Sequence, residues 1–346
     1  MVAPAVDVLI RGAGPVGCTA ALAMRRAGLN VALFDPRPAA PAFRPLALSH
    51  ASRLILERLG VWQHLRVTPI EHIVVSHAGR FGRTRLDAAD AGVPALGYQT
   101  EYAALAAALR GALGDVFTPQ APAAKCIVHA EGTPGEEPGK RYRHDVLVAL
   151  LETDPPARAT AYERFTPAGP LALLPLAARY ALIWSLEPAP AQRLAEAPEP
   201  EFTAEFARVA PSGAGRVVGV HSRSVQVPTL RVRSVRASGN EVYIGNAAQT
   251  LHPVAGQGLN LGLRDAWDLA RALAAAPDPA DAAVLARYAT ARRLDARAAI
   301  GVTDFLASGF AATSALMSAA LMTLDFFPPA RRFFARRMIF GASALP

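Results

Sequence analysis

The fold is decided by the stretch Val6-Asp7-Val8-Leu9-Ile10-Arg11-Gly12-Ala13-Gly14-Pro15-Val16-Gly17. Its apolar beginning, at residues 6–10, is typical of a parallel strand that is buried on both faces. Residues 18–27 are predicted to form a helix that ends at Gly28, and residues 31–34 a second strand that ends at Asp35. Strand, glycine turn, helix and strand together make a βαβ unit of about 30 residues, the unit that binds a dinucleotide.

Each glycine of this turn has its own physical task. Gly12 allows the tight turn, Gly14 lets the backbone approach a pyrophosphate, and Gly17 lets the helix pack against the strand. The phosphates would then lie at the helix N-terminus, where free N–H groups and the helix dipole favour anions. Asp35 is placed to bind the ribose hydroxyls of the adenosine, and its charge disfavours the 2′-phosphate of NADP at this site.

A second glycine-bearing segment lies far downstream, where Val242-Tyr243-Ile244 runs into Gly245-Asn246-Ala247-Ala248-Gln249-Thr250-Leu251-His252-Pro253-Val254-Ala255-Gly256-Gln257-Gly258-Leu259-Asn260. The segment resembles the C-terminal flavin motif of the class A flavoprotein aromatic hydroxylases. In that motif a strand ends in G-D/N-A-A-H/Q, followed by P-x-x-G-Q-G and a helix. The resemblance implies that the ligand of both segments is FAD.

The same resemblance assigns roles within the segment. It implies that Asn246 caps the strand end and reaches the ribityl chain of FAD. Gly256, Gln257 and Gly258 would begin a helix whose N–H groups point at the flavin ring, and Asn260 joins the expected cofactor-binding residues. His252 and Pro253 are interpreted as residues that shape the loop over the flavin, with a catalytic role for His252 as the alternative.

Two further stretches narrow the resemblance. Residues 161–167 (AYERFTP) and 169–175 (GPLALLP) are similar to the substrate-domain signature of the ubiquinone-biosynthesis hydroxylases. The Gln-Thr-Leu-His-Pro form of residues 249–253 and the stretch 300–304 (IGVTD) are similar to the 2-polyprenyl-6-methoxyphenol hydroxylase branch. Arg44 matches the arginine of the family's FAD-binding loop. The similarity runs from about residue 6 to about residue 340.

The resemblance implies an enzyme, an FAD-dependent aromatic-ring monooxygenase. NAD(P)H would reduce FAD at a transient site without a Rossmann domain of its own. Reduced flavin would take O₂ to give a C4a-hydroperoxyflavin, which would transfer oxygen to the ring of a polyprenylated phenol in ubiquinone biosynthesis. Because the flavin performs this chemistry, no catalytic side chain is assigned. No metal is expected, since the eight histidines show no metal-ligand spacing.

The expected fold class is α/β, with a Rossmann-like FAD-binding domain, a mixed or antiparallel substrate sheet, and C-terminal helices. The FAD-binding domain is predicted to be discontinuous, comprising residues 1–69, 97–139 and 236–285. Residues 70–96 and 140–235 would form the substrate domain. A C-terminal helical region would cover residues 286–346.

Composition limits the partners. The formal charge is +8, but nearly all of it comes from scattered arginine without aromatic interleaving, so we expect no nucleic-acid binding. Two cysteines make no disulfide framework. No signal peptide or membrane span is predicted, and residues 305–327 are interpreted as a buried or interfacial helix. Arginines at 331, 332, 336 and 337 indicate a peripheral contact with the inner face of the membrane in a cytoplasmic protein.

The chain also departs from the family pattern. Ala130-Glu131-Gly132 stands where the family has A-D-G, and Ala104 and Ala108 replace polar residues. Only twelve residues, 114–125, lie where the family has a multi-stranded segment, although three strands with turns need roughly 20. These losses leave open a non-catalytic member of a quinone-biosynthesis complex, or a related hydroxylase of another aromatic substrate. Tyr162 and Arg164 are predicted to face either a pocket or solvent.

Overall fold

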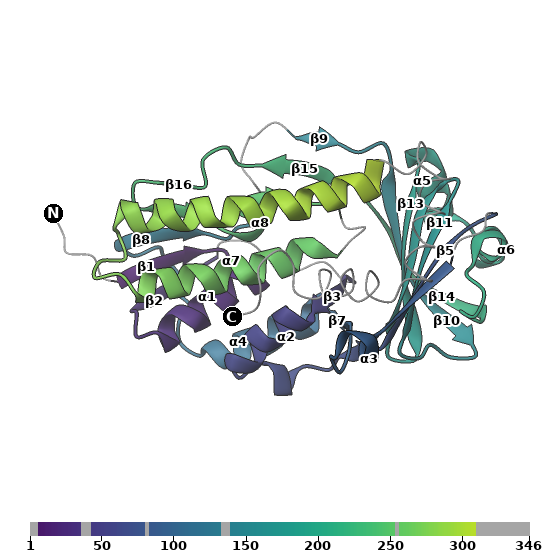
Figure 1. The fold of residues 1–346 in the computed structure, drawn as a ribbon, viewed down its shortest axis with the longest axis horizontal. Coiled ribbons are helices and arrows are strands. Elements are labelled where there is room, and N and C mark those ends of the chain that lie inside the picture. The colour runs from purple at the N-terminus through teal and green to yellow at the C-terminus, as the bar shows by residue number, and fades with distance from the viewer. Residues whose placement is uncertain (1–5, 36–42, 80–82, 133–138, 253–255, 309–346) are drawn as a thin grey trace.

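The computed structural model describes residues 6–35, 43–79, 83–132, 139–252 and 256–308. Two large sheets lie at opposite ends of the molecule, and most of the helices pack around the sheet that contains the N-terminal strand (Figure 1). The helical elements are α1 (Pro15–Arg26), α2 (His50–Arg58), η1 (Trp62–His64), α3 (Ala88–Ala91), α4 (Tyr102–Leu113), α5 (Pro188–Glu196), α6 (Glu199–Val209), η2 (Gly245–Ala247), α7 (Gln257–Ala274) and α8 (Ala282–Ser308).

The first large sheet has five strands in the order β16-β17-β8-β1-β2. Its strands are β1 (Val6–Arg11), β2 (Val31–Phe34), β8 (Ala124–His129), β16 (Ala237–Ser238) and β17 (Glu241–Tyr243). The β1, β2, β8 and β17 strands pair in parallel, and β16 pairs antiparallel to β17. The predicted βαβ unit is therefore confirmed, and β17 brings the second glycine segment into the same sheet.

The second large sheet has seven strands in the order β14-β10-β13-β12-β11-β5-β6. Its strands are β5 (His72–His77), β6 (Arg83–Asp87), β10 (Asp145–Asp154), β11 (Thr160–Thr166), β12 (Gly169–Leu176), β13 (Arg179–Leu186) and β14 (Arg216–Gln226). All pairs are antiparallel except β11 with β5. Two short sheets complete the fold. One comprises β3 (Pro45–Ser49), β7 (Gly97–Glu101) and β4 (Thr68–Ile70); the other β18 (Gln249–Thr250), β15 (Thr229–Val232) and β9 (Lys140–Arg141).

The two faces of the seven-stranded sheet have different neighbours. One face packs against α5 and α6 in a core that includes Tyr162, Leu173, Leu182, Phe202 and Phe206. The opposite face turns toward the rest of the molecule (Figure 1). Side chains alternate between the faces along each strand, so neighbours in sequence meet different surroundings. This alternation decides which residues of β11 reach the site.

The structure differs from the sequence expectations in two places. Residues 188–200 are rich in proline and alanine, and the sequence predicts a helix only from about residue 201, yet helix α5 forms before it. Its prolines lie in the first turn, where the missing N–H leaves no hydrogen bond unmade. The short segment 114–125 does not interrupt the five-stranded sheet, because β8 pairs directly with both β1 and β17.

Several predictions fall outside the described residues. They concern Pro253, the segment that follows Gly132, and the arginine-rich C-terminus, as well as the predicted helix 305–327 beyond its first few residues. In the part of the chain that the structure does describe, no helix is long and apolar enough to cross a membrane.

Candidate functional site

The glycine turn after β1 has no room for a side chain at Gly12 or Gly17. A Cβ on Gly17 would lie 1.9 Å from the carbonyl oxygen of Gly12. Gly12 itself has a φ of +103°, and a Cβ there would lie 2.5 Å from the oxygen of Ala130 at the end of β8. Gly14 is the N-cap of α1. The backbone is thus exposed at the start of a helix, which is the geometry of a phosphate cradle.

Asp35 closes one side of this turn. The backbone N–H of Ala13 donates to Asp35 Oδ2 at 2.7 Å, so the carboxylate at the end of β2 is held against the cradle. Arg44 lies nearby on the chain that enters β3, with its guanidinium 5.6 Å from the centre of the Tyr102 ring. A Cβ on Gly14 would in turn lie 3.4 Å from the Tyr102 hydroxyl. The structure therefore brings these sequence-predicted residues to one place.

Close helix packing joins the second glycine segment to the first. Gly262 of α7 lies against Val16 of α1, where a Cβ would come within 2.7 Å of a valine methyl. Gly245, with a φ of +57°, lies against the same valine at 3.0 Å. Small residues at these two positions let η2 and α7 approach α1, which sets the distance between the two predicted cofactor segments.

A buried carboxylate fixes the base of the second segment. Asp265 has no exposed surface. Its Oδ2 accepts hydrogen bonds from the N–H of Gly245 and from the amide of Gln249, each at 3.1 Å. Its Oδ1 pairs with Arg292 of α8 at 2.7 Å and with Arg236 at 3.2 Å. We call these five residues the Asp265 junction.

The charges of the Asp265 junction balance one another. Burial acts to raise the pKa of Asp265, but the Arg292 and Arg236 guanidiniums outweigh it and hold the pKa below its usual value. Asp265 thus remains a carboxylate that fixes the glycine turn after β17. The sequence alone assigns no role to Asp265, because its cationic partners lie 29 and 27 residues away.

The start of α7 faces the same space as η2. Gly256 caps the helix in the left-handed region, with a φ of +57°. A Cβ on Gly258 would lie 4.0 Å from the side-chain oxygen of Asn246. Asn246 and Gln257 both line the cavity described below. The start of α7 therefore lies beside Asn246 at the edge of the cavity.

Asn260, in the first turn of α7, ties this helix to β3 and α2. Its side-chain oxygen accepts from the Ser49 N–H at 2.8 Å and from the Ser52 hydroxyl at 2.7 Å. Its amide donates to the carbonyls of Ala47 and Gly256, both at 2.8 Å. The resemblance implies that Asn260 contacts the cofactor. The structure shows a side chain whose two polar atoms both bind protein.

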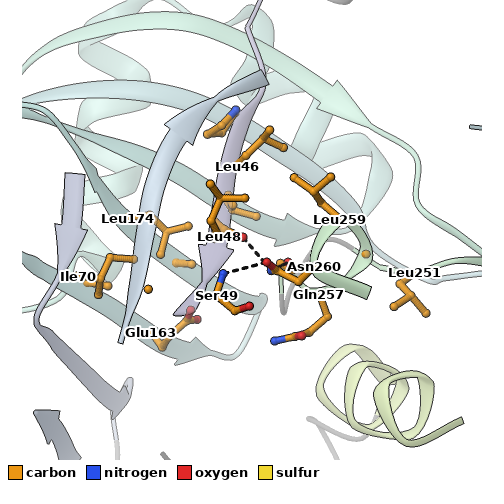
Figure 2. Close-up of a pocket in the computed structure, with 18 of the residues that line it drawn as sticks. Leu46, Leu48, Ser49, Ile70, Glu163, Leu174, Leu251, Gln257, Leu259 and Asn260 are labelled. Atoms are coloured by element: carbon orange, nitrogen blue, oxygen red, sulfur yellow. Dashed lines mark hydrogen bonds between the residues drawn. The ribbon is translucent and has the colours of Figure 1, made fainter. Parts of the chain in front are cut away.

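A cavity of about 230 Å³ lies between the start of α7 and the seven-stranded sheet. Figure 2 shows the labelled lining residues: Leu46, Leu48, Ser49, Ile70, Glu163, Leu174, Leu251, Gln257, Leu259 and Asn260. Most of these side chains are aliphatic. The lining suits an apolar ligand whose orientation is set by few polar groups.

One row of side chains crosses the sheet along the cavity wall. Glu163 of β11 pairs in register with Ala172 of β12, which pairs with Ile183 of β13, which pairs with Val148 of β10. All four line the cavity, and we call them the cavity row. Glu163 is the one ionisable member of this row. Burial among these neighbours raises the pKa of its carboxyl to about 8.

The neighbours of Glu163 on β11 point the other way. The hydroxyl of Tyr162 donates to the carbonyl of Gly213 at 2.7 Å, within the core between the sheet and helices α5 and α6. Arg164 is hydrogen-bonded to the Ser76 hydroxyl at 3.3 Å. Neither residue lines the cavity. From the sequence, Tyr162 and Arg164 could face either a pocket or solvent. In the structure the residue of β11 that lines the cavity is Glu163, which lies between them. The alternation of side chains along a strand is the signal that could have indicated this residue.

His252 lines the cavity from the loop after β18. Its side chain is buried and packs edge-on against the Tyr142 ring, with 4.7 Å between the ring centroids. Burial, with a smaller contribution from His144, lowers the pKa of His252 to about 4. The imidazole is therefore neutral near pH 7. The packing agrees with the positional interpretation of His252.

The residues present fit FAD. A cradle that a Cβ would fill stands at the start of α1, beside an acid that can bind ribose, and a second helix start faces an apolar cavity. Among the described residues, no group of three or more His, Cys, Asp or Glu is arranged to hold a metal ion. The arrangement thus defines a flavin-dependent aromatic hydroxylase.

Comparison with known proteins supports that class. A family model described as "FAD binding domain" matches residues 5–108 and 126–303. The ubiquinone hydroxylase UbiL of Rhodospirillum rubrum is 30% identical over 380 residues, covering 95% of this chain and 88% of that protein. The 3-demethoxyubiquinol 3-hydroxylase of Escherichia coli is 28% identical over 342 residues, covering 84% and 86%.

Solved structures share the fold at low sequence identity. The HpxO protein of Klebsiella pneumoniae, complexed with FAD and uric acid, has a TM-score of 0.78 at 16% identity and covers 96% of each chain. The chain belongs to the FAD-binding domain family. It is an FAD-dependent aromatic monooxygenase, and NAD(P)H is its electron donor. The cofactor predictions from sequence are thereby confirmed.

Proposed function

We propose that this monooxygenase hydroxylates the aromatic ring of a polyprenylated phenol in ubiquinone biosynthesis. The observation that carries the proposal is the aliphatic cavity between the start of α7 and the seven-stranded sheet. The two relatives of this chain named above are a ubiquinone hydroxylase and a 3-demethoxyubiquinol 3-hydroxylase. A prenylated phenol offers that cavity one polar hydroxyl and a largely apolar remainder.

The size of the cavity constrains how such a substrate would bind. A dry cavity of about 150 Å³ is enough for benzene in another protein. The cavity of about 230 Å³ is lined in part by residues assigned to the flavin, so a substrate can place at most a substituted ring there, and not a long polyprenyl tail. The tail has to leave the cavity, and a tail that apolar favours a membrane surface over water. We therefore also propose a cytoplasmic protein that works at the inner face of the membrane, alone or within a quinone-biosynthesis complex.

FAD supplies the hydride acceptance and oxygen activation when it is bound. In the proposal, Gly12, Gly14 and Gly17 bind its phosphates and Asp35 its ribose. Asn246 and the helix start at Gly256–Gly258 hold the flavin end, with Asn260 fixing that helix start against β3. Arg44 faces the cofactor from the entrance to β3. The aliphatic walls exclude water from the reacting ring.

The experiment is the visible spectrum of the purified protein, followed by incubation with NAD(P)H, O₂ and 2-farnesylphenol. We expect a flavin spectrum and, by mass spectrometry, a product one oxygen heavier than the substrate. Gly17→Ala should be colourless because its Cβ would overlap the Gly12 carbonyl. Gly111→Ala is the matched control, since a Cβ at that position of α4 meets nothing within 4 Å. A flavin-loaded protein that oxidises NAD(P)H but leaves the phenol unchanged would contradict the proposal.

A further inference from the structure

Glu163 carries a carboxyl group for which the described contacts within the protein give no structural role. It stands in the cavity row, flanked in register by Ala172 on one strand and Val75 on the other. Within the part of the chain that the structure describes, no hydrogen bond or ion pair is found for its carboxyl group. The residue is partly exposed and lines the cavity. An unpartnered carboxyl costs stability at such a site, so its presence points to a ligand.

The direction of the side chain agrees with that inference. Figure 2 shows the Glu163 carboxyl on the side of the residue that faces Ser49 and the other drawn residues that line the cavity. The side chains around it are aliphatic or small, including Ile70, Leu174 and Ala161. The other ionisable residues that line the cavity, among those described, are Arg44 and His252. Neither contributes to the raised pKa of Glu163, which comes from burial.

We propose that Glu163 is the catalytic residue that binds the phenolic hydroxyl of the substrate and accepts its proton during ring hydroxylation. The proposal rests on the proposed function, because it requires a phenol in the cavity. In the step, the phenol O–H bond breaks and the proton joins a carboxylate oxygen of Glu163. The bonding electron pair stays on the phenolate oxygen, which makes the ring richer in electrons for attack by an electrophilic oxygen. The proton returns to the hydroxylated product.

The surroundings of Glu163 suit it to this proton. A phenol has an ordinary pKa of about 10. A carboxyl at its usual value of 4.5 is a poor base for such a proton, whereas burial brings the pKa of Glu163 to about 8. A base is most effective when its pKa lies near the working pH and near that of the group it deprotonates. The aliphatic row that raises the pKa of Glu163 also holds the ring beside it.

The first test uses turnover by the FAD-loaded enzyme. Hydroxylation of 2-farnesylphenol is measured from about pH 6 to about pH 9 in wild type, Glu163→Gln, Glu163→Asp and Glu152→Gln. We expect the wild-type rate to rise through a pKa near 8, because the carboxylate form is needed. Glu163→Gln keeps a hydrogen-bonding group but cannot take the proton. Its kcat should fall by about 10²-fold with little change in KM, and the rise should disappear.

Two variants serve as controls for that result. Glu152→Gln makes the same change at an exposed glutamate of β10, paired with Arg179, and should leave the rate and pH profile unchanged. Glu163→Asp keeps the carboxylate and should retain a pH-dependent rate at a lower level. The proposal is overturned if Glu163→Gln keeps the wild-type kcat and pH profile, or if Glu163→Asp is as inactive as Glu163→Gln.

The second test needs no turnover. Binding of 2-farnesylphenol and of its methyl ether, 2-farnesylanisole, is followed at about pH 9 through the flavin absorbance. A hydrogen bond to a charged group is worth about 1.5–3 kcal/mol, so wild type should prefer the phenol by about 10-fold or more. Glu163→Met keeps the side-chain length without a carboxyl and should lose that preference. Equal preference in both proteins overturns the proposal.

The two tests separate the inference from the function on which it rests. If wild type prefers the phenol in binding but hydroxylates nothing, the proposed function fails while the contact with Glu163 stands. If wild type hydroxylates 2-farnesylphenol and Glu163→Gln does so equally well at every pH, the proposed function stands and the role of Glu163 fails.

Discussion

The Asp265 junction and the cavity row each place a carboxyl group inside the protein, but they surround it differently. Asp265 is met by two guanidiniums, an amide and a backbone N–H. Glu163 is met by aliphatic side chains. The pKa of Asp265 is lowered and that of Glu163 is raised to about 8. The carboxylate of Asp265 is thus neutralised by partners within the protein, whereas the carboxyl group of Glu163 is left available to a ligand.

The largest effect is expected when the charge of Asp265 is removed. Asp265→Asn removes the carboxylate that pairs with buried Arg236 and Arg292, of which only Arg292 has further carboxylates, Asp268 and Asp295, among the ion pairs of the described residues. It should lower the free energy of unfolding by about 3–5 kcal/mol. Urea unfolding measures the change. Glu205→Gln removes an exposed partner of Arg208 and serves as the control, with no measurable loss expected. Equal stability of Asp265→Asn and wild type would show that the junction does not hold the fold.

The next effect has the opposite sign. Unfolded Glu163 ionises near 4.5 and folded Glu163 near 8, so the folded state keeps a proton that the unfolded state has released. The stability that Glu163 contributes is complete below about pH 4.5 and is lost as the pH rises through about 8. Glu163→Gln should therefore be more stable than wild type by a few kcal/mol, as an order of magnitude, at about pH 9.

The pH dependence of that gain is the sharper measurement. Unfolding curves of Glu163→Gln and wild type should converge as the pH falls toward about 4.5. A constant difference at all pH values would mean that the substitution changes packing and that the carboxyl does not titrate as described.

A smaller effect comes from His252, which faces the same cavity. Its pKa is about 4 in the folded state against an ordinary 6.5, so the unfolded state takes up the proton first as the pH falls. Wild type should lose stability relative to His252→Gln between about pH 6.5 and about pH 4, by at most about 1.4 kcal/mol per pH unit. Thermal unfolding across this range checks it. Parallel curves would refute the lowered pKa.

The smallest effect tests the two faces of β11. Tyr162→Phe removes the hydrogen bond to Gly213 on the helix-covered face and should cost about 1 kcal/mol of unfolding free energy. The pH profile of hydroxylation should stay as in wild type, because Tyr162 does not line the cavity. A shifted profile would mean that the two faces are coupled.

The parts of the molecule that sequence predicted well are those that backbone geometry dictates. Gly12 and Gly17 occupy positions where a Cβ would overlap a carbonyl group, so the pattern reports the turn directly. The βαβ unit followed from such local rules, whereas the start of α7 followed from the resemblance to the flavin motif. Helix α5 was not predicted in the stretch 188–200, which is rich in proline and alanine, although proline is favourable in a first turn.

The parts that sequence did not predict depend on register and on distant partners. Glu163 faces the cavity because β11 pairs with β12 and β5 in one particular register, and a shift of one residue would place Tyr162 there. The cationic partners of Asp265 come from α8 and from the chain before β17. No local pattern marks either relation. The role of Asn260 is similar, since its partners lie more than 200 residues earlier in the chain.

The position of the cavity row on the sheet affects how substrate preference could be altered by substitution. Its members come from four adjacent strands whose backbone ladders hold the sheet together whatever the side chains are. Ala172 and Ile183 can therefore change in size while the strand pairing and the cofactor cradle stay in place. In an engineering setting, enlarging or filling these two positions offers a way to retune which ring substituents are accepted. Within one sheet, Glu163 can thus keep its place while the aliphatic members of the row beside it change.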